Sequence, residues 1–166
     1  MGKNTLDKPL LANATLGSEK KQAVKQAIYA EPASMPINYN IDHDQCLVMA
    51  TPHGVLTDGD VFGNQQEVWS RADTSGYNEL IDMTGVSQIE FISADRVADL
   101  ADLSGSMDSP ASASKLAIIA TAELHFGLGR MYQARREMAE PSTKVVRVFR
   151  DRQEALQWLG IRIEMP

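Results

Sequence analysis

The chain has 166 residues, of which 43% are hydrophobic and 23% are charged, and its formal net charge at pH 7 is -6. This length suits about one domain, whose core is large enough to fold without a disulfide or a structural metal. The acidic balance argues against general nucleic-acid binding, and no apolar run in the sequence is long enough to span a membrane. With one cysteine and no apolar signal segment, the sequence predicts a cytoplasmic protein.

The charges change sign along the chain. Residues 37–114 contain two Arg and thirteen acidic residues, whereas residues 115–166 contain nine basic and six acidic residues. The two parts can form ion pairs with each other, or they can stay solvated as separate patches. In the second case, a basic face could bind an acidic partner protein or anionic lipid head groups. This face would contain Arg130, Arg135, Arg136, Arg147, Arg150 and Arg152.

Residues 1–36 are interpreted as an N-terminal extension. The first 17 residues are polar and show no periodicity, and Ser18 can cap a short helix that ends before Pro32. A helix of about 13 residues is marginal in isolation, so we expect this extension to be partly helical or disordered. Met35 stands just before the first strand pattern and is an alternative start of the natural chain.

Regular structure is predicted from residue 37 onwards. Alternating apolar residues predict a strand over 37–41, and a second strand over 46–50 would complete a hairpin that ends at residues 51–54. Thr57 and Asp60 then mark the start of a helix over 58–71. We expect this helix to bury four side chains, those of Val61, Phe62, Val68 and Trp69.

The second half of the chain alternates strands and helices. The pattern predicts strands over 78–82, 115–120 and 144–149 and helices over 94–103, 122–138 and 152–159, with a loop over 104–114. Ser93 and Asp151 are predicted N-caps. The order ββαβαβαβα predicts an α/β domain over 37–160 with a mixed, mostly parallel five-stranded sheet and four helices, followed by a tail over 161–166.

Several stretches resemble a known family. They are Leu-Ile-Asp-Met-Thr-Gly at 80–85, Leu-Ala-Ile-Ile-Ala at 116–120, Leu-His-Phe-Gly-Leu-Gly-Arg-Met-Tyr at 124–132, Val-Phe-Arg-Asp at 148–151 and Glu-Ala-Leu-Gln-Trp-Leu at 154–159. Together they are similar to the bacterial SpoIIAA-like proteins, which are relatives of STAS domains and of CRAL-TRIO lipid-binding domains. The resemblance covers 37–160 and implies a small α/β sandwich that acts by binding other proteins.

One departure from the family pattern concerns regulation. In STAS relatives that antagonise anti-sigma factors, the helix after the third strand starts with Asp-Ser-Ser-Gly-Leu, and a partner kinase phosphorylates the second serine. The equivalent residues 93–97 are Ser-Ala-Asp-Arg-Val, so Asp95 stands at the phosphorylated position. The resemblance therefore implies protein binding without the usual phosphoserine. Ser93 is either the N-cap of this helix or a shifted phosphate acceptor.

The Gly-rich start of the helix over 122–138 has two interpretations. Gly127 and Gly129 do not complete a dinucleotide fingerprint, because Tyr132 stands where a third small residue is required, and we predict no cofactor. The glycines either let the helix approach the sheet closely, or they form an anion site with Arg130 and free backbone N–H groups. The alternative to protein binding is thus a carrier of a small apolar ligand or lipid, with its pocket under this helix and Arg130 as head-group anchor.

The remaining polar residues give only weak signals. His43, His53 and His125 are not spaced as zinc ligands, and no Gly-x-Ser-x-Gly motif is present, so we predict neither a metal site nor an enzyme. Cys46 is expected to be buried and inert. Asp82 ends a strand at the edge where α/β sheets bind ligands, or it caps the following turn. We also expect that two copies can pair through an exposed sheet edge.

Overall fold

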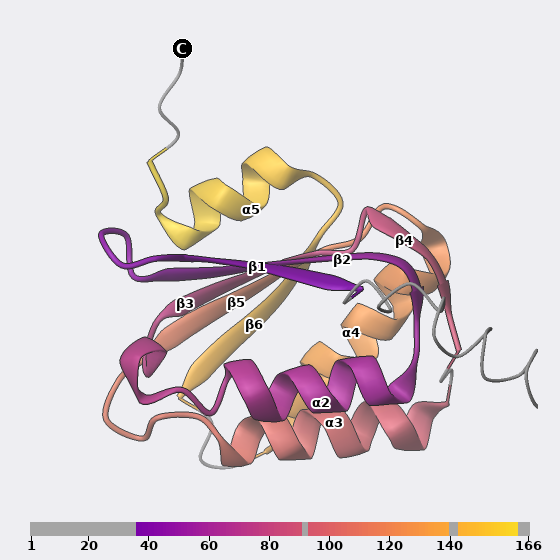
Figure 1. Cartoon of the computed structure of the whole chain (residues 1–166), viewed down its shortest axis with the longest axis horizontal. Coiled ribbons are helices and arrows are strands. Elements are labelled where there is room, and N and C mark those ends of the chain that lie inside the picture. The colour runs from indigo at the N-terminus through magenta and orange to yellow at the C-terminus, as the bar shows by residue number, and fades with distance from the viewer. Residues whose placement is uncertain (1–35, 91–92, 140–142, 163–166) are drawn as a thin grey trace, which may run out of the picture. The chain divides into compact units, whose positions relative to one another are not determined.

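The computed structural model describes residues 36–90, 93–139 and 143–162. Residues 1–35 of the predicted extension and the last four residues of the predicted tail lie outside these ranges, so both assignments stay predictions. The described residues form the predicted α/β fold, with a mixed, mostly parallel sheet between two helix layers (Figure 1). The described helices include none that is long and apolar enough to cross a membrane.

Six strands form the sheet in the order β1-β2-β3-β5-β6, with β4 beside the second half of β2. β1 and β2 are an antiparallel hairpin, and the other pairs are parallel. The strands are β1 (Ile37–Asp42), β2 (Leu47–Leu56), β3 (Asn78–Asp82), β4 (Gly85–Ile89), β5 (Ser114–Ile119) and β6 (Lys144–Phe149).

Two predictions about the sheet are wrong. β2 does not end at residue 50 but continues to Leu56, because it changes partner along its length: its first part pairs with β3, and the part from His53 pairs with β4. A bulge between Gly54 and Val55, with Gly54 at φ 68°, lets the strand continue. The sheet therefore has a sixth strand, β4, which starts within the turn signal Met83-Thr84-Gly85 and was not predicted.

The helices are α2 (Asp58–Val68), α3 (Ala94–Ser106), α4 (Glu123–Met138) and α5 (Arg152–Leu159), with a short 3-10 turn at Ala72–Thr74. Within the described residues, the predicted capping side chains of Thr57, Ser93 and Asp151 each accept a backbone N–H bond, at the starts of α2, α3 and α5. The prediction for the packing of α2 is wrong, since none of its side chains is buried and Val61, Phe62, Val68 and Trp69 are all half-buried. Val61 and Trp69 are not fully covered because they line the cavity described below, and Phe62 lies against the guanidinium of Arg96.

The sheet has a core on each face because successive strand side chains point to opposite sides. On β5, Leu116 and Ile118 pack towards α3 and α4, whereas Ala117 and Ile119 pack towards α5. Among the helices of the described residues, α5 alone covers the second face, and α2, α3 and α4 cover the first (Figure 1). Cys46 belongs to neither core. It is exposed in the β1–β2 turn at φ 49°, so the expected burial of its thiol is wrong.

Candidate functional site

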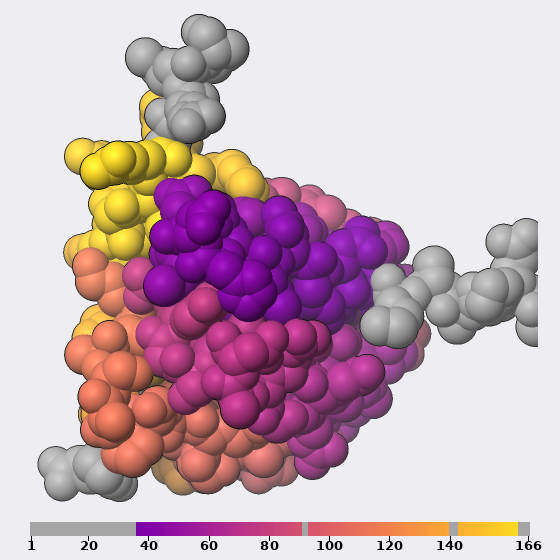
Figure 2. Space-filling view, turned by 60° about the vertical axis from the view of Figure 1, so that its left-hand side comes forward, coloured from indigo at the N-terminus to yellow at the C-terminus, as the bar shows by residue number. Residues whose placement is uncertain are grey.

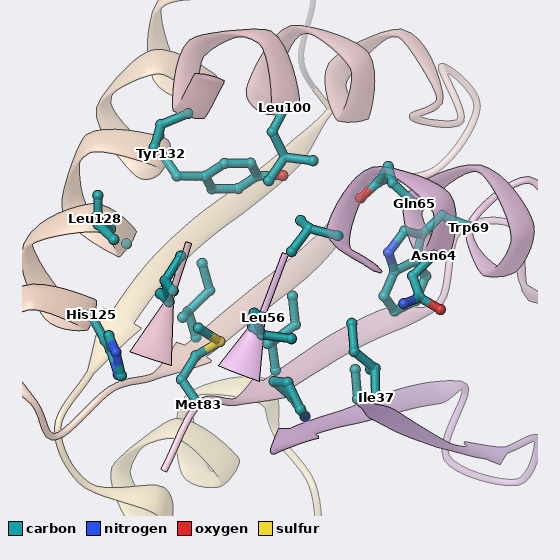
Figure 3. Close-up of a pocket in the computed structure, with 18 of the residues that line it drawn as sticks. Ile37, Leu56, Asn64, Gln65, Trp69, Met83, Leu100, His125, Leu128 and Tyr132 are labelled. Carbon is teal, nitrogen blue, oxygen red and sulfur yellow. The ribbon is translucent and has the colours of Figure 1, made fainter. Parts of the chain in front are cut away.

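A cavity of about 140 Å³ lies between the first face of the sheet and helices α2, α3 and α4 (Figure 3). Ile81 of β3 and Ile118 of β5 form part of its floor, and Leu56 of β2 lies beside them. Val97 and Leu100 of α3 line it from the helix layer. Most of the lining is apolar, so the cavity favours uncharged, hydrophobic molecules.

The wall formed by α4 depends on one of the two glycines. A Cβ atom at Gly129 would lie 3.2 Å from both terminal methyl carbons of Val148, so the absence of a side chain lets α4 sit close to the sheet. A Cβ atom at Gly127 would meet nothing within 4 Å, because this residue is on the exposed side of the helix. Of the two glycines, only Gly129 therefore allows the close approach of the helix to the sheet.

The cavity-facing side of α4 presents His125, Leu128 and Tyr132 in addition to Gly129 (Figure 3). Arg130 does not belong to this side. A helix residue two positions from Tyr132 points in a very different direction, so Arg130 is exposed. Its Nη1 donates to Gln133 Oε1 at 3.0 Å. Arg130 and Gly127 are thus not brought together with Tyr132, and Arg130 does not line the cavity as a head-group anchor.

Asp82 lies on the other face of the sheet. Its neighbour Ile81 points into the cavity, so Asp82 points towards α5, where Arg152 Nη1 donates to its carboxylate at 2.6 Å. The other carboxylate oxygen accepts bonds from the backbone and hydroxyl of Thr84, at 3.1 and 2.6 Å. Asp82 therefore caps the turn after β3 and takes part in an ion pair, and the sheet separates it from the α4 residues.

α2 covers the cavity beside β1, an edge strand of the sheet, whose residues Ile37 and Tyr39 line the cavity. On the surface β1 and α2 lie side by side (Figure 2), and Tyr39 meets Trp69 edge-on with ring centroids 6.1 Å apart. Burial, with a smaller effect of Glu67, raises the pKa of the Tyr39 hydroxyl, which therefore stays protonated. Asn64 and Gln65 also line the cavity from α2, so its rim carries polar groups.

Few contacts attach α2 to the rest of the domain. Arg96 of α3 holds the first turn, where its Nε donates to Asp58 at 2.7 Å, and its guanidinium lies 4.2 Å from the ring centroid of Phe62. Near the other end, Gln65 Nε2 lies 3.8 Å from Met107 Sδ. α2 is thus a cover with few polar contacts to the other helices, and Val61 and Trp69 line the cavity from it.

A second, polar cavity of about 270 Å³ adjoins the first, because Gln65, Trp69, Ile81 and Tyr132 line both. Its walls contain two ion pairs, Arg136 with Asp108 and Lys144 with Glu79. The Arg136 side chain is 1% exposed and also donates to the Tyr132 hydroxyl at 3.0 Å. Burial lowers the pKa of Lys144 to about 8.

The sequence reasoning missed His125 and Arg136. Arg136 was grouped with Arg130 and Arg135 on a basic face, whereas the structure buries it. The signal that could have found both is spacing: His125, Gly129, Tyr132 and Arg136 follow one another at intervals of four, three and four residues, and all four are buried on one side of α4.

Ion pairs also divide the predicted basic face. Arg135 is held by Asp102 at 2.8 Å, Arg150 by Glu123 at 2.9 Å, and Arg152 by Asp82. Most of these acids belong to residues 37–114, so the two oppositely charged parts of the chain pair with each other. Arg147 instead lies 5.7 Å from the ring centroid of Phe149.

Ser93 is the N-cap of α3, where its hydroxyl oxygen accepts from the backbone N–H of Arg96 at 3.2 Å. Asp95 is exposed in the first turn of the helix, where a carboxylate is favourable. Neither residue lines the cavities. The described residues include no cluster of three His, Cys, Asp or Glu side chains that could hold a metal ion.

No family model and no curated protein matches the chain. Among solved structures, it is similar to an uncharacterized protein of the DUF3478 family with a SpoIIAA-like fold from Shewanella loihica PV-4. The two are 21% identical, and the match covers 74% of this chain and 91% of that chain with a TM-score of 0.48.

Proposed function

We propose that this chain is a non-enzymatic binding module that takes a small apolar ligand into the cavity under α4. The observation that carries the proposal is an apolar cavity that α2 covers without burying any side chain of its own. Protein interiors are normally close-packed, and an empty cavity reduces stability. A ligand that fills the space would therefore stabilise the folded chain.

The size of the cavity limits the ligand. A cavity of about 150 Å³ with a hydrophobic lining binds benzene in another protein, and the cavity here is about 140 Å³. The apolar part of the ligand is therefore close to a benzene ring or a short alkyl chain in size. A lipid with long acyl chains would need α2 to move away.

The chemistry of the lining supports binding without catalysis. Tyr132 accepts a bond from Arg136, and Asn64 donates to the carbonyl oxygen of Asp60, so both side chains already have partners. Among the described residues that line the apolar cavity, no Ser, Cys or Lys nucleophile stands beside a base. These groups can orient a ligand but supply no reactive constellation.

Native mass spectrometry and thermal unfolding of the full chain test this proposal. We expect either a retained small molecule or a rise of Tm with toluene. Ala50→Leu, which fills the cavity from β2, should reduce that rise, whereas Ala134→Leu on the exposed side of α4 should not. A mass without ligand together with a Tm that toluene leaves unchanged would contradict the proposal.

Protein binding through the outer side of α4 is the second candidate function. Leu124, Met131 and Met138 are 50%, 42% and 76% exposed, and their spacing of seven residues places them on one stripe. Gly127 and Ala134 lie between them and are also exposed. A continuous exposed apolar stripe is typical of an interaction surface.

A pull-down from source cells with matched variants tests the second candidate. Met131→Asp places a charge in the stripe, and Gln133→Asp places one beside it. We expect the wild type and Gln133→Asp to capture the same protein and Met131→Asp to lose it. Equal capture by all three would contradict this function, and sedimentation would show whether the partner is a second copy of the chain.

A further inference from the structure

We infer that the ligand is amphipathic, with an apolar group in the apolar cavity and a polar head group without net charge in the polar cavity. The inference rests on the proposed function and extends it by naming the chemistry of the head group. It is carried by the shared walls of the two cavities and by the balance of charges in the polar one.

The two cavities are successive sections of one trough along the sheet. On β3, Glu79 lines the polar section and Ile81, two residues later on the same face, reaches the apolar section. On β5, Ser114 lies in the polar section and Ile118 in the apolar one. One step of two strand residues is about 6.6 Å, so a short linker joins the two sections.

Tyr132 marks the border between the sections. Its ring contributes to the apolar cavity (Figure 3). Its hydroxyl accepts a bond from Arg136 in the polar cavity. Burial raises the pKa of this hydroxyl, so it keeps its proton. A ligand that lies along the trough would pass Tyr132 with its apolar part on one side and its polar part on the other.

The charged side chains of the polar section form pairs. Arg136 is paired with Asp108, Lys144 with Glu79, and the more exposed Arg71 with Asp73. Moving a charged group out of water is costly unless an opposite charge compensates it. Because these cations and anions already compensate each other, a head group with a net charge finds no compensation here among the described residues.

A head group without net charge can instead use the donors and acceptors of the polar section. The hydroxyl groups of Thr74, Ser104 and Ser114 lie in its walls, and Ser104 Oγ is a buried atom without a hydrogen-bond partner. A hydroxyl head could bond to such groups. A zwitterion could do the same, and its two charges could also lie along the existing ion pairs.

Isothermal titration of the full chain with a series of phenylpropyl compounds tests the inference. Propylbenzene is the apolar reference, phenylpropanol and phenylalanine carry heads without net charge, and phenylpropionate and phenylpropylamine carry one charge. We expect at least one of the two heads without net charge to bind about tenfold more tightly than propylbenzene. Which of them does so distinguishes a hydroxyl ligand from a zwitterionic one. Neither singly charged compound should bind more tightly than propylbenzene.

The double variant Lys144→Met, Glu79→Leu removes both members of one ion pair, so neither charge of that pair is left buried without the other, and the variant should fold. We expect it to bind propylbenzene as the wild type does and to lose the gain from a zwitterionic head, whose charges lie along the ion pairs, but to keep the gain from a hydroxyl head. The exposed double variant Arg130→Met, Gln133→Leu should keep the gain from either head. Tighter binding of a charged head, or binding of propylbenzene with no gain from any head, overturns the inference and leaves the proposed function standing. Failure of every compound to bind overturns the proposed function as well.

Discussion

Arg136 combines a full positive charge with nearly complete burial. Its guanidinium is held by Asp108 and by the Tyr132 hydroxyl, so the charge is compensated inside the domain. The neighbouring Arg135 makes a similar pair with Asp102 in contact with solvent. Two adjacent arginines with similar partners should thus differ strongly in their importance for folding.

Arg136→Met should lower the free energy of unfolding by about 3–5 kcal/mol, because it leaves the carboxylate of Asp108 buried without this partner. Arg135→Met should have little effect, since solvent screens the exposed pair. Urea denaturation of both variants measures the difference. Equal effects of the two substitutions would show that the buried pair has no special role.

Gly127 and Gly129 of α4 form a second matched pair of residues. Gly127→Ala should raise the free energy of unfolding by about 0.5–1 kcal/mol, because alanine suits a helix better and its Cβ meets no atom. Gly129→Ala brings a Cβ atom to 3.2 Å from two methyl carbons of Val148. The resulting strain should outweigh the gain and lower the free energy by about 1 kcal/mol. Thermal unfolding of both variants measures these changes in stability. Stabilisation by both substitutions would contradict the close approach of α4 to the sheet.

Lys144 gives the stability a dependence on pH. Burial lowers its pKa from 10.5 to about 8 in the folded chain. Between these pH values the unfolded chain binds more protons than the folded chain, so the contribution of Lys144 to the free energy of unfolding rises with pH, by at most about 1.4 kcal/mol per unit. Urea denaturation from pH 8 to 10.5, compared with Lys144→Met, Glu79→Leu, measures this rise. A difference that stays constant with pH would contradict it.

Among the elements, α2 differs most from its prediction. The Thr57–Asp60 capping box was readable from the sequence because it depends on residues three apart in the chain. The incomplete burial of Val61 and Trp69 could not be read from the sequence. A pattern of apolar residues identifies the inward side of a helix, but it does not show whether the space on that side is filled. β4 was missed for a related reason, since the strand that it pairs with among the described residues is an unexpected extension of β2.

The limited packing of α2 leads to a prediction about its dynamics. Backbone amides of α2 should exchange with solvent faster than those of α4, because local opening costs least where few side chains are buried. Toluene should slow exchange in α2 more than in α5, which lies on the other face of the sheet. Hydrogen exchange followed by mass spectrometry measures both, and equal protection of α2 and α4 without ligand would contradict its role as a cover.

At the scale of the whole molecule, the alternation of strands and helices was enough to predict the class of fold. It was not enough to place the site, because the site depends on which side of α4 faces the sheet. Gly129 and Tyr132, which the sequence analysis proposed as ligand-binding residues, line the apolar cavity, whereas Arg130 and Asp82 point elsewhere. Among the described residues, ion pairs between the acidic and basic parts of the chain, Arg136 with Asp108 and Lys144 with Glu79, balance charges in the walls of the polar cavity.

The central claim is that a small apolar ligand binds between the sheet and α2, α3 and α4. Intermolecular NOEs between toluene and methyl-labelled protein test it most directly. The account predicts NOEs from toluene to the methyl groups of Ile118, Val97 and Leu128, which line the cavity, and none to those of Leu47 and Ile119 on the α5 face. NOEs confined to the α5 face or to Leu124 on the outer stripe, or no NOEs at all, would contradict it.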